Sequence, residues 1–209
     1  MKWALDAGQQ WISAASCNKT PRMSDHDRLV WIDLEMTGLD PREHRILEIG
    51  TLITDASLDV VAEGPEIVVS ASEDVLSGMN DWSRDHHQAS GLLDRVRAST
   101  VTVEEAEQRT LEFVRAHCVE GQVPLAGNSI HMDRFFLKFH MPALEAFLHY
   151  RNVDVTTLKE LARRWNPKVL EQAPRKTDTH RAMEDIRESI AELRYYRERL
   201  IVLAPEIGS

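Results

Sequence analysis

Residues 29–35, LVWIDLE, constrain the fold of this chain more than any other segment. Branched and aromatic residues favour an extended strand, and successive side chains of a strand alternate between its two faces. Asp33 and Glu35 therefore leave the same face, about 6.6 Å apart along the backbone. Ile32 and Leu34 face the other way and are apolar. Such a strand belongs in the middle of a sheet, where two bare carboxylates are costly without a positive partner.

Hard divalent cations such as Mg²⁺ are the usual partners of clustered carboxylates, so this pair is a candidate metal site. Taken alone, the pair equally describes the solvated face of a strand. A second candidate is Asp133, which follows a short strand and the turn residues Gly127 and Asn128. It falls on the first turn of a helix, where an acid also serves simply to complement the helix dipole.

The third set lies in THRAMED at the beginning of the last helix, where His180 and Asp185 are five positions apart. A continuous helix would turn these two side chains away from each other. They converge only if His180 lies in the preceding loop or at the frayed end of the helix, as the polar residues 175–179 allow. A lone histidine is otherwise a surface residue more often than a base.

The apolar pattern divides the chain into strands first and helices later. Strand patterns cover 29–35 and 46–54, and the segments 58–62 and 65–70 form either a third strand or a hairpin extension. A helical period begins after a capping box of Thr102 and Glu105. It is followed by a short strand at 123–126 and by helices at 132–139, from 142, at 158–165 and at 182–200. This order predicts an α/β fold with a mixed sheet covered by helices.

Composition narrows the class of protein. With 209 residues and 43% hydrophobic residues, the chain suits one compact domain. No apolar run approaches the roughly 20 residues that cross a bilayer, so we expect no membrane association. The two cysteines, Cys17 and Cys118, form neither a C-x-x-C pair nor a disulfide framework, which favours a reducing cytoplasm.

The formal charge of −9 bears on possible partners. Proteins that wrap long nucleic acids gain most of their affinity from basic residues that neutralise many phosphates. This chain lacks that excess, so a polynucleotide substrate should be held along only a short length.

Residues 1–24 stand apart from the body as an N-terminal leader that we expect to be vector-derived or without fixed structure. Asp6, Gln9 and Gln10 interrupt the apolar stretch that a secretory signal requires. Met23 is a candidate natural start, and a short functional arm remains an alternative. Residues 25–209 are predicted to form the single functional domain.

Taken in order, the three acidic sets resemble the motifs of the DEDD exonucleases, in the branch that carries a histidine. The first motif, D-x-E-x-T-G, is DLEMTG at residues 33–38. Four longer strings, WIDLEMTGLD, GNSIHMDRFF, DVTTLKELARRW and THRAMEDIRES, are similar to the oligoribonuclease family in particular. The resemblance covers the chain from about residue 29 to about residue 200.

The resemblance implies a ribonuclease H-like fold, a five-stranded mixed sheet flanked by helices. It implies hydrolysis of very short RNA, including linear dinucleotides, from the 3′ end to 5′-nucleoside monophosphates. Two divalent cations, Mg²⁺ or Mn²⁺, would be held by Asp33, Glu35 and Asp185, with Asp133 completing the site directly or through water. His180 would act as the general base, since an imidazole pKa near 6.5 suits that role.

By the same resemblance, Leu39 would wedge against the terminal bases and His87, in DHHQASG, would meet the substrate. Asn128 and Ser129 would line the pocket. In HYRNVDVT, the residues that resemble the family's cap on the 5′ phosphate are Tyr150, Arg151 and Thr156. The family is homodimeric, which implies that Tyr150 reaches the neighbouring subunit's site.

Simpler interpretations stay open for several of these residues. Leu39 also suits a turn, His87 a solvated surface and Tyr150 plain interface packing. In the loop before His180, Arg175 to Thr179 replace the Lys-x-Gly-Thr approach of many members, and the additional Asp178 would either repel phosphate or help to hold a cation.

Two rival functions follow from the same residues. One is an exonuclease that trims longer RNA or DNA 3′ ends, which should carry basic clusters around its site. The other is a non-catalytic nucleic-acid-binding or scaffold protein, which should have lost some of the five catalytic positions. All five are filled by competent residues.

Overall fold

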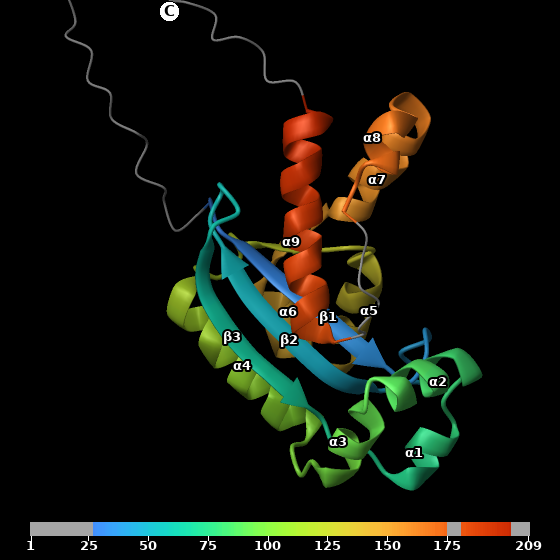
Figure 1. Ribbon diagram of the computed structural model, residues 1–209. Coiled ribbons are helices and arrows are strands. Elements are labelled where there is room, and N and C mark those ends of the chain that lie inside the picture. Colours follow the sequence, from blue (N-terminus) through green and yellow to red (C-terminus); the bar gives the residue numbers. More distant parts are fainter. Residues whose placement is uncertain (1–26, 175–180, 202–209) are drawn as a thin grey trace, which may run out of the picture.

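A computed structural model describes residues 27–174 and 181–201 (Figure 1). Five strands form one sheet with the order β3-β2-β1-β4-β5. Strand β1 pairs antiparallel with β2 and parallel with β4, while β2 pairs antiparallel with β3 and β4 pairs parallel with β5. Their bounds are Leu29–Met36 for β1, Ile46–Thr54 for β2, Val60–Val68 for β3, Pro124–Gly127 for β4 and His149–Asp154 for β5.

The helices of the described residues lie around this sheet. Three short ones follow β3, namely α1 (Glu73–Ser77), α2 (Asp81–Ala89) and α3 (Leu92–Ala98). The others are α4 (Val103–His117), α5 (His131–His140), α6 (Pro142–Phe147), α7 (Val155–Trp165), α8 (Pro167–Glu171) and α9 (Ala182–Arg199).

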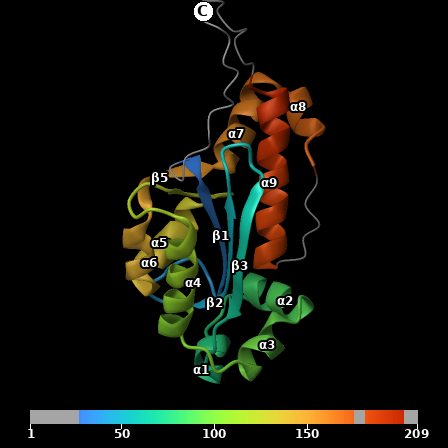
Figure 2. The same ribbon diagram turned by 90° about the vertical axis from the view of Figure 1, so that its left-hand side faces the viewer.

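Strand β1 is the middle strand of the sheet, and both of its faces are covered. Val30, Ile32 and Leu34 join a core that continues into α4, α5 and α6. Trp31 faces the opposite side and packs in a second core with residues of α7 and α9. Figure 2 shows these two helical layers on either side of the sheet. The predicted central position of the strand is confirmed.

Three parallel strands, β1, β4 and β5, end at the same edge of the sheet. In sheets of this kind, ligands bind outside the carboxyl ends of the strands, since the loops that follow the strands converge there. The segments that leave this edge are residues 37–45, 128–130 and 155 onwards. They contain several of the residues that the sequence singled out.

Helix α9 approaches the sheet unusually closely at Gly50 in β2. A Cβ atom at this glycine would lie 3.0 Å from the carbonyl carbon and the Cβ of Ala182, tighter than an ordinary contact. The missing side chain of Gly50 and the small one of Ala182 together allow the beginning of α9 to rest directly on the sheet. The acidic residues of β1 and of α9 are brought together in this way.

The described structure confirms the α/β fold with a mixed five-stranded sheet flanked by helices. The segments around Glu63 and Gly64 form a single third strand, β3, with an irregularity in its pairing to β2. Thr102 caps α4, accepting a hydrogen bond from the Glu105 backbone N–H at 3.2 Å. Helices α1, α2, α3 and α8 and strand β5 were not predicted from the pattern. Within the described ranges, no helix is both long and apolar enough to cross a bilayer.

We expect Gly50→Val to destabilise the protein by about 1–3 kcal/mol, because a branched side chain at this position overpacks the contact with Ala182. Urea unfolding followed by circular dichroism measures the effect. Gly78→Val is the control, since a Cβ at Gly78 meets only ordinary contacts of 3.6 Å or more. Equal stability of the two variants would show that α9 tolerates displacement at Gly50.

Candidate metal centre

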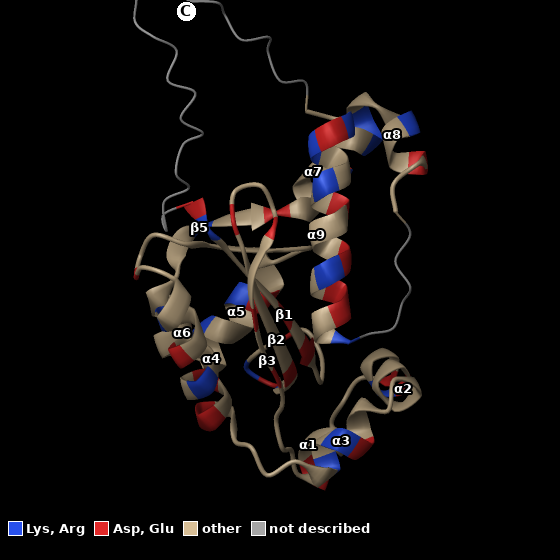
Figure 3. Ribbon diagram, turned by 60° about the vertical axis from the view of Figure 1, so that its left-hand side comes forward, with Lys and Arg blue, Asp and Glu red and all other residues tan. Residues whose placement is uncertain are grey.

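Three carboxylates converge on the face of the sheet that α9 covers. One oxygen each from Asp33, Glu35 and Asp185 lies within 4.8 Å of the other two, a spacing that suits a shared cation. Asp33 and Glu35 leave β1 on one face, and Asp185 lies in the first turn of α9. All three residues are of intermediate burial. Figure 3 shows acidic segments of the sheet beside the beginning of α9.

Asp133 lies next to this group but outside the set of three. It is in the first turn of α5, only 7% exposed, and its Oδ1 accepts a hydrogen bond from the Leu34 backbone N–H at 3.0 Å. Leu34 lies beyond the last residue of β1 that pairs with β4, so the Asp133 side chain takes the place of a strand partner. Its charge still reaches Glu35 and raises the pKa of that carboxyl group.

The electrostatics of the centre favour a bound cation. Burial raises the pKa of Glu35 to about 8, and the negative charges of Asp185, Glu48 and Asp133 add to the effect. Arg95 opposes this shift without cancelling it. A divalent cation would stabilise the ionised form of Glu35 and balance the neighbouring acids. The donor set, oxygen atoms of carboxylates, fits a hard cation of the Mg²⁺ or Mn²⁺ type.

His87 lies against the centre and not on an open surface. It is buried in α2, and its Nε2 lies 2.9 Å from the carbonyl oxygen of Met36 at the end of β1. Its Nδ1 lies 3.7 Å from Oε2 of Glu35. His87 therefore connects α2 both to the backbone of β1 at Met36 and to the side chain of Glu35.

Asn128, Ser129 and Thr156 meet at the carboxyl ends of β4 and β5. The Ser129 backbone N–H donates to Thr156 Oγ1 at 2.8 Å and to Oδ1 of Asp154 at 3.0 Å, with Ser129 at a positive φ of 50°. Thr156 Oγ1 also donates to Oδ1 of Asn128 at 3.1 Å. Ser129 and Thr156 line a cavity of about 320 Å³ together with His131, Asp154, Thr157, Glu160, Leu161 and Arg164.

Leu39, Tyr150 and Arg151 lie at exposed positions. Leu39 is 68% exposed in the turn that follows β1, at the same edge of the sheet as the acids. Tyr150 is 74% exposed and stands near the beginning of the edge strand β5, beside Arg151. Thr156 follows the end of that strand, so the Tyr150 segment is separated from the other predicted substrate residues of the same chain by the length of β5.

The prediction for His180 lies outside the described residues, as does the altered loop before it. The described chain resumes at Arg181, which precedes α9.

Sequence reasoning missed two charged residues beside the centre, Glu48 in β2 and Arg95 in α3. Glu48 is completely buried and is paired in register with Glu35, and Arg95 Nη2 lies 2.8 Å from its Oε1. A signal was present, because Glu48 is the only charged residue in the apolar run ILEIGTLIT. A lone charge in such a strand marks either an ion pair or a site.

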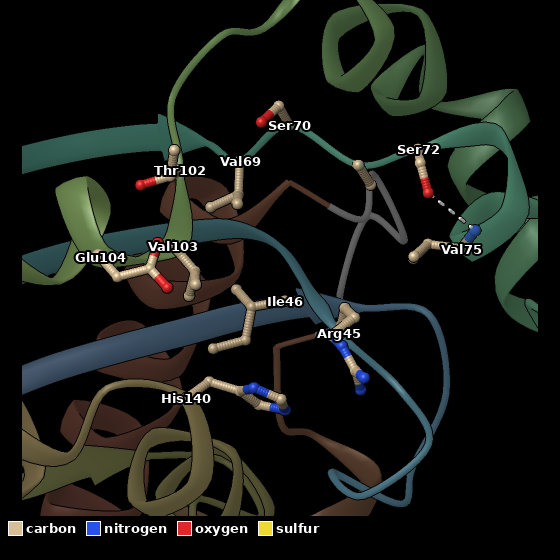
Figure 4. A pocket seen from close by; sticks show the side chains of 11 residues that line it. Arg45, Ile46, Val69, Ser70, Ser72, Val75, Thr102, Val103, Glu104 and His140 are labelled. Atoms are coloured by element: carbon tan, nitrogen blue, oxygen red, sulfur yellow. Dashed lines mark hydrogen bonds between the residues drawn. The ribbon is translucent and has the colours of Figure 1, made fainter.

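A separate cavity of about 270 Å³ lies beside the other core of the sheet (Figure 4). Arg45 and His140 lie on one side of it, and Val69, Ser70 and Thr102 lie opposite. It contains none of the clustered carboxylates, so it is distinct from the metal centre.

A family model described as Exonuclease (RNase_T) matches residues 30–193. The oligoribonuclease of Marinobacter nauticus is 55% identical over 181 residues, which cover 87% of this chain and all of that protein. The oligoribonuclease of Escherichia coli K12 is 56% identical over 180 residues, which cover 86% of this chain and 99% of that protein.

Among solved structures, exonuclease I of Methylocaldum szegediense superimposes with a TM-score of 0.63 at 21% identity. A structure of exonuclease I, reported to suggest how processivity is achieved, gives 0.65 at 16% identity. These alignments cover 82% and 83% of this chain but only 40% and 41% of those longer chains. At this level of identity the likeness concerns the fold, which is ribonuclease H-like as predicted.

We expect the wild-type protein in EDTA to lose stability as the pH rises from about 5 to 8, more than Glu35→Gln does. Unfolded Glu35 ionises near 4.5, whereas the folded carboxyl stays protonated up to about 8. Between these values the folded state holds one more proton, so each pH unit lowers the free energy of unfolding, by up to roughly 1.4 kcal/mol. Urea unfolding at several pH values measures both slopes.

Glu198→Gln, on α9, is the control and should keep the wild-type slope. Saturating Mn²⁺ should flatten the slope of the wild type, because a cation keeps Glu35 ionised in the folded state. Identical slopes for wild type and Glu35→Gln in EDTA would contradict the raised pKa.

Proposed function

This chain belongs to the oligoribonuclease family of DEDDh exonucleases, which are 3′-to-5′ exoribonucleases, and we propose that it is specialised for RNA of two to a few nucleotides. The observation that carries the proposal is the convergence of Asp33, Glu35 and Asp185 at the carboxyl edge of the sheet, in a protein of net charge −9. An acidic protein suits a substrate that presents few phosphates.

In the proposed mechanism, Asp33, Glu35 and Asp185 would hold two divalent cations, with Asp133 as the fourth acid. The cations would stabilise the charge on the attacking and leaving oxygens of an in-line displacement at phosphorus. Four carboxylates match the charge of two such ions. Asp133 orients the end of β1 through its hydrogen bond to Leu34 and contributes its charge at the same time.

His180 is the proposed general base. Its side chain takes a proton from the water that attacks the 3′-terminal phosphodiester. The bond between phosphorus and the 3′ oxygen of the preceding nucleotide then breaks, and that oxygen receives a proton. The products are a 5′-nucleoside monophosphate and an RNA shorter by one nucleotide, or two mononucleotides when the substrate is a dinucleotide.

Residues around the carboxyl edge would recognise both ends of a short substrate. Leu39, exposed beside the acids, provides an apolar surface for a terminal base, and His87 supports that side from α2. Ser129 and Thr156 present hydroxyl groups to the second cavity, and Asn128 holds Thr156 in place. A site that ends at the corner formed by Ser129 and Thr156 suits an RNA whose 5′ phosphate lies close to its 3′ end.

The remaining residues of the 5′ cap, Tyr150 and Arg151, are proposed to act in the second subunit of a homodimer. They are exposed on the edge strand β5, next to α5, whose Phe135 and Phe139 rings are also exposed and in contact with each other. Arg134 ties α5 to the β5 backbone, donating to the His149 carbonyl at 2.7 Å. Sedimentation that found only monomers would remove this part of the proposal.

A cytoplasmic location is proposed as well, on the grounds of the two widely separated cysteines. Detection of the native protein outside the cytoplasm by fractionation would contradict it.

The decisive assay is hydrolysis of 5′-labelled RNA of two to about twenty nucleotides with Mn²⁺ or with EDTA. We expect rapid, metal-dependent cleavage of the dinucleotide that declines with length, because the site offers few contacts to additional phosphates. Asp185→Ala should abolish cleavage. Preference for the longest RNA would favour a trimming exonuclease, and no cleavage at any length would favour a binding or scaffold role.

In the same assay, His180→Ala should lower kcat by roughly 10²–10⁴-fold, the usual contribution of a general base. Calorimetry should show unchanged Mn²⁺ affinity, since the imidazole is not a proposed ligand. His117→Ala, on α4 on the opposite side of the sheet, is the matched control. Unchanged turnover in His180→Ala would remove the histidine from the mechanism.

A further inference from the structure

The acidic residues on the α9 side of the sheet extend beyond the metal centre. Glu48 is paired with Glu35 across β1 and β2, and Glu66 in β3 is paired with Gly50, which is itself paired with Asp33. Glu48 is completely buried, and burial raises its pKa while Arg95 counteracts this effect. A buried carboxylate of this kind requires cationic partners that are fixed in place.

Two arginines from different elements supply that charge. Arg95 from α3 lies 2.8 Å from Glu48 and 3.8 Å from Glu66. Arg181, just before α9, donates from Nη2 to Glu66 Oε1 at 2.6 Å, and its Nε lies 4.0 Å from Glu48. The two acids and two arginines form one network that balances its own charge beside the centre.

The position of Arg181 in the chain is unusual for a cation. It is the N-cap residue of α9, and no side chain among the described residues caps this helix end. A positive charge at a helix N-terminus opposes the helix dipole, so helix formation alone does not favour an arginine there. The two carboxylates on the strands below supply the compensating interaction.

Arg181 is linked directly to a ligand of the centre. Its carbonyl oxygen accepts a hydrogen bond from the Asp185 backbone N–H at 2.9 Å, which forms the first turn of α9. The next residue, Ala182, rests on Gly50. The beginning of the helix is therefore held by the Arg181 side chain over β3 and by the contact of Ala182 with β2.

We propose that Arg181, anchored by Glu66 and Glu48, is a positioning residue that fixes the first turn of α9 and so holds Asp185 at the metal centre. The expected effect of Arg181 on turnover rests on the function proposed above. The expected effect of Arg181 on cation affinity does not depend on that function. With a neutral residue at position 181, Arg95 would be the remaining cationic partner of Glu48 in this network, and the first turn of α9 would lose its ion pair to β3.

The test compares Arg181→Gln with Arg187→Gln in the full-length protein. Arg187 lies within α9, more than a helical turn beyond Arg181, and it likewise pairs with an acid of β3, Glu63 at 2.9 Å. Calorimetry with Mn²⁺ should show an affinity about tenfold weaker for Arg181→Gln, a typical effect for residues that orient a ligand. Arg187→Gln should bind Mn²⁺ as the wild type does.

Two further readouts separate positioning from general destabilisation. Both variants should show similar, small changes in the urea midpoint in EDTA, because Arg181–Glu66 and Arg187–Glu63 are both partly exposed ion pairs and Arg95 still lies beside the buried Glu48. On a dinucleotide, Arg181→Gln should lower kcat while KM stays within about twofold, since no substrate contact is removed. Glu66→Gln should weaken Mn²⁺ binding in the same direction, and the double variant should be no weaker than Arg181→Gln alone.

The proposal would be overturned if Arg181→Gln bound Mn²⁺ as tightly as the wild type does. It would also be overturned if Arg187→Gln lost as much Mn²⁺ affinity as Arg181→Gln, because that result would indicate general loosening of α9. If the wild type cleaved no RNA while Arg181→Gln still bound Mn²⁺ about tenfold more weakly, the proposed function would fail and the positioning role would stand.

Discussion

The accumulation of negative charge beside the central strand is the constraint on which the rest of this structure depends. Asp33, Glu35 and Glu48 lie on neighbouring positions of β1 and β2, and α9 adds Asp185. Like charges this close destabilise a folded protein unless cations compensate them. Two kinds of cation can do so in different places. Arginines balance the acids toward β3, and under the proposed function divalent cations would balance the acids of β1 and α9.

This division explains why small residues occur where α9 meets the sheet. Gly50 lies between Asp33 and Glu66 in the register of the three strands, and Ala182 rests on it. A bulkier pair would lift the helix and separate Asp185 from Asp33 and Glu35 on one side and Arg181 from Glu66 on the other. The packing of Ala182 on Gly50 and the ion pairs of Arg181 thus set the same distance between α9 and the sheet, so neither can change independently.

Sequence patterns predicted the parts of the fold in which apolar side chains face a core. These patterns did not predict α2, because the buried residues of this helix are Ser83 and His87. Both are polar, so the segment shows no helical period of apolar residues. The patterns also failed for β5, an edge strand with no fully buried residue and no alternation of buried and exposed side chains. The sequence predicted Asp33, Glu35 and Asp185 as one site from motif order, and these three converge.

What the sequence could not supply is the pairing of residues distant in the chain. Arg181 and Glu66 are 115 positions apart, and only the strand register together with the Gly50 contact brings them within hydrogen-bonding distance.

Helix α9 also joins the metal centre to the corner formed by Ser129 and Thr156. Ser189 and Glu192, one and two turns beyond Asp185, accept hydrogen bonds from Asn128 at 2.9 and 3.1 Å, and Lys159 of α7 pairs with Glu192. Asn128 in turn accepts a hydrogen bond from Thr156, so α9 is connected both to the acids and to this corner. Because the same helix contributes Asp185 to the acids and holds Asn128 at the corner, a displacement of α9 would move both parts of the proposed site together.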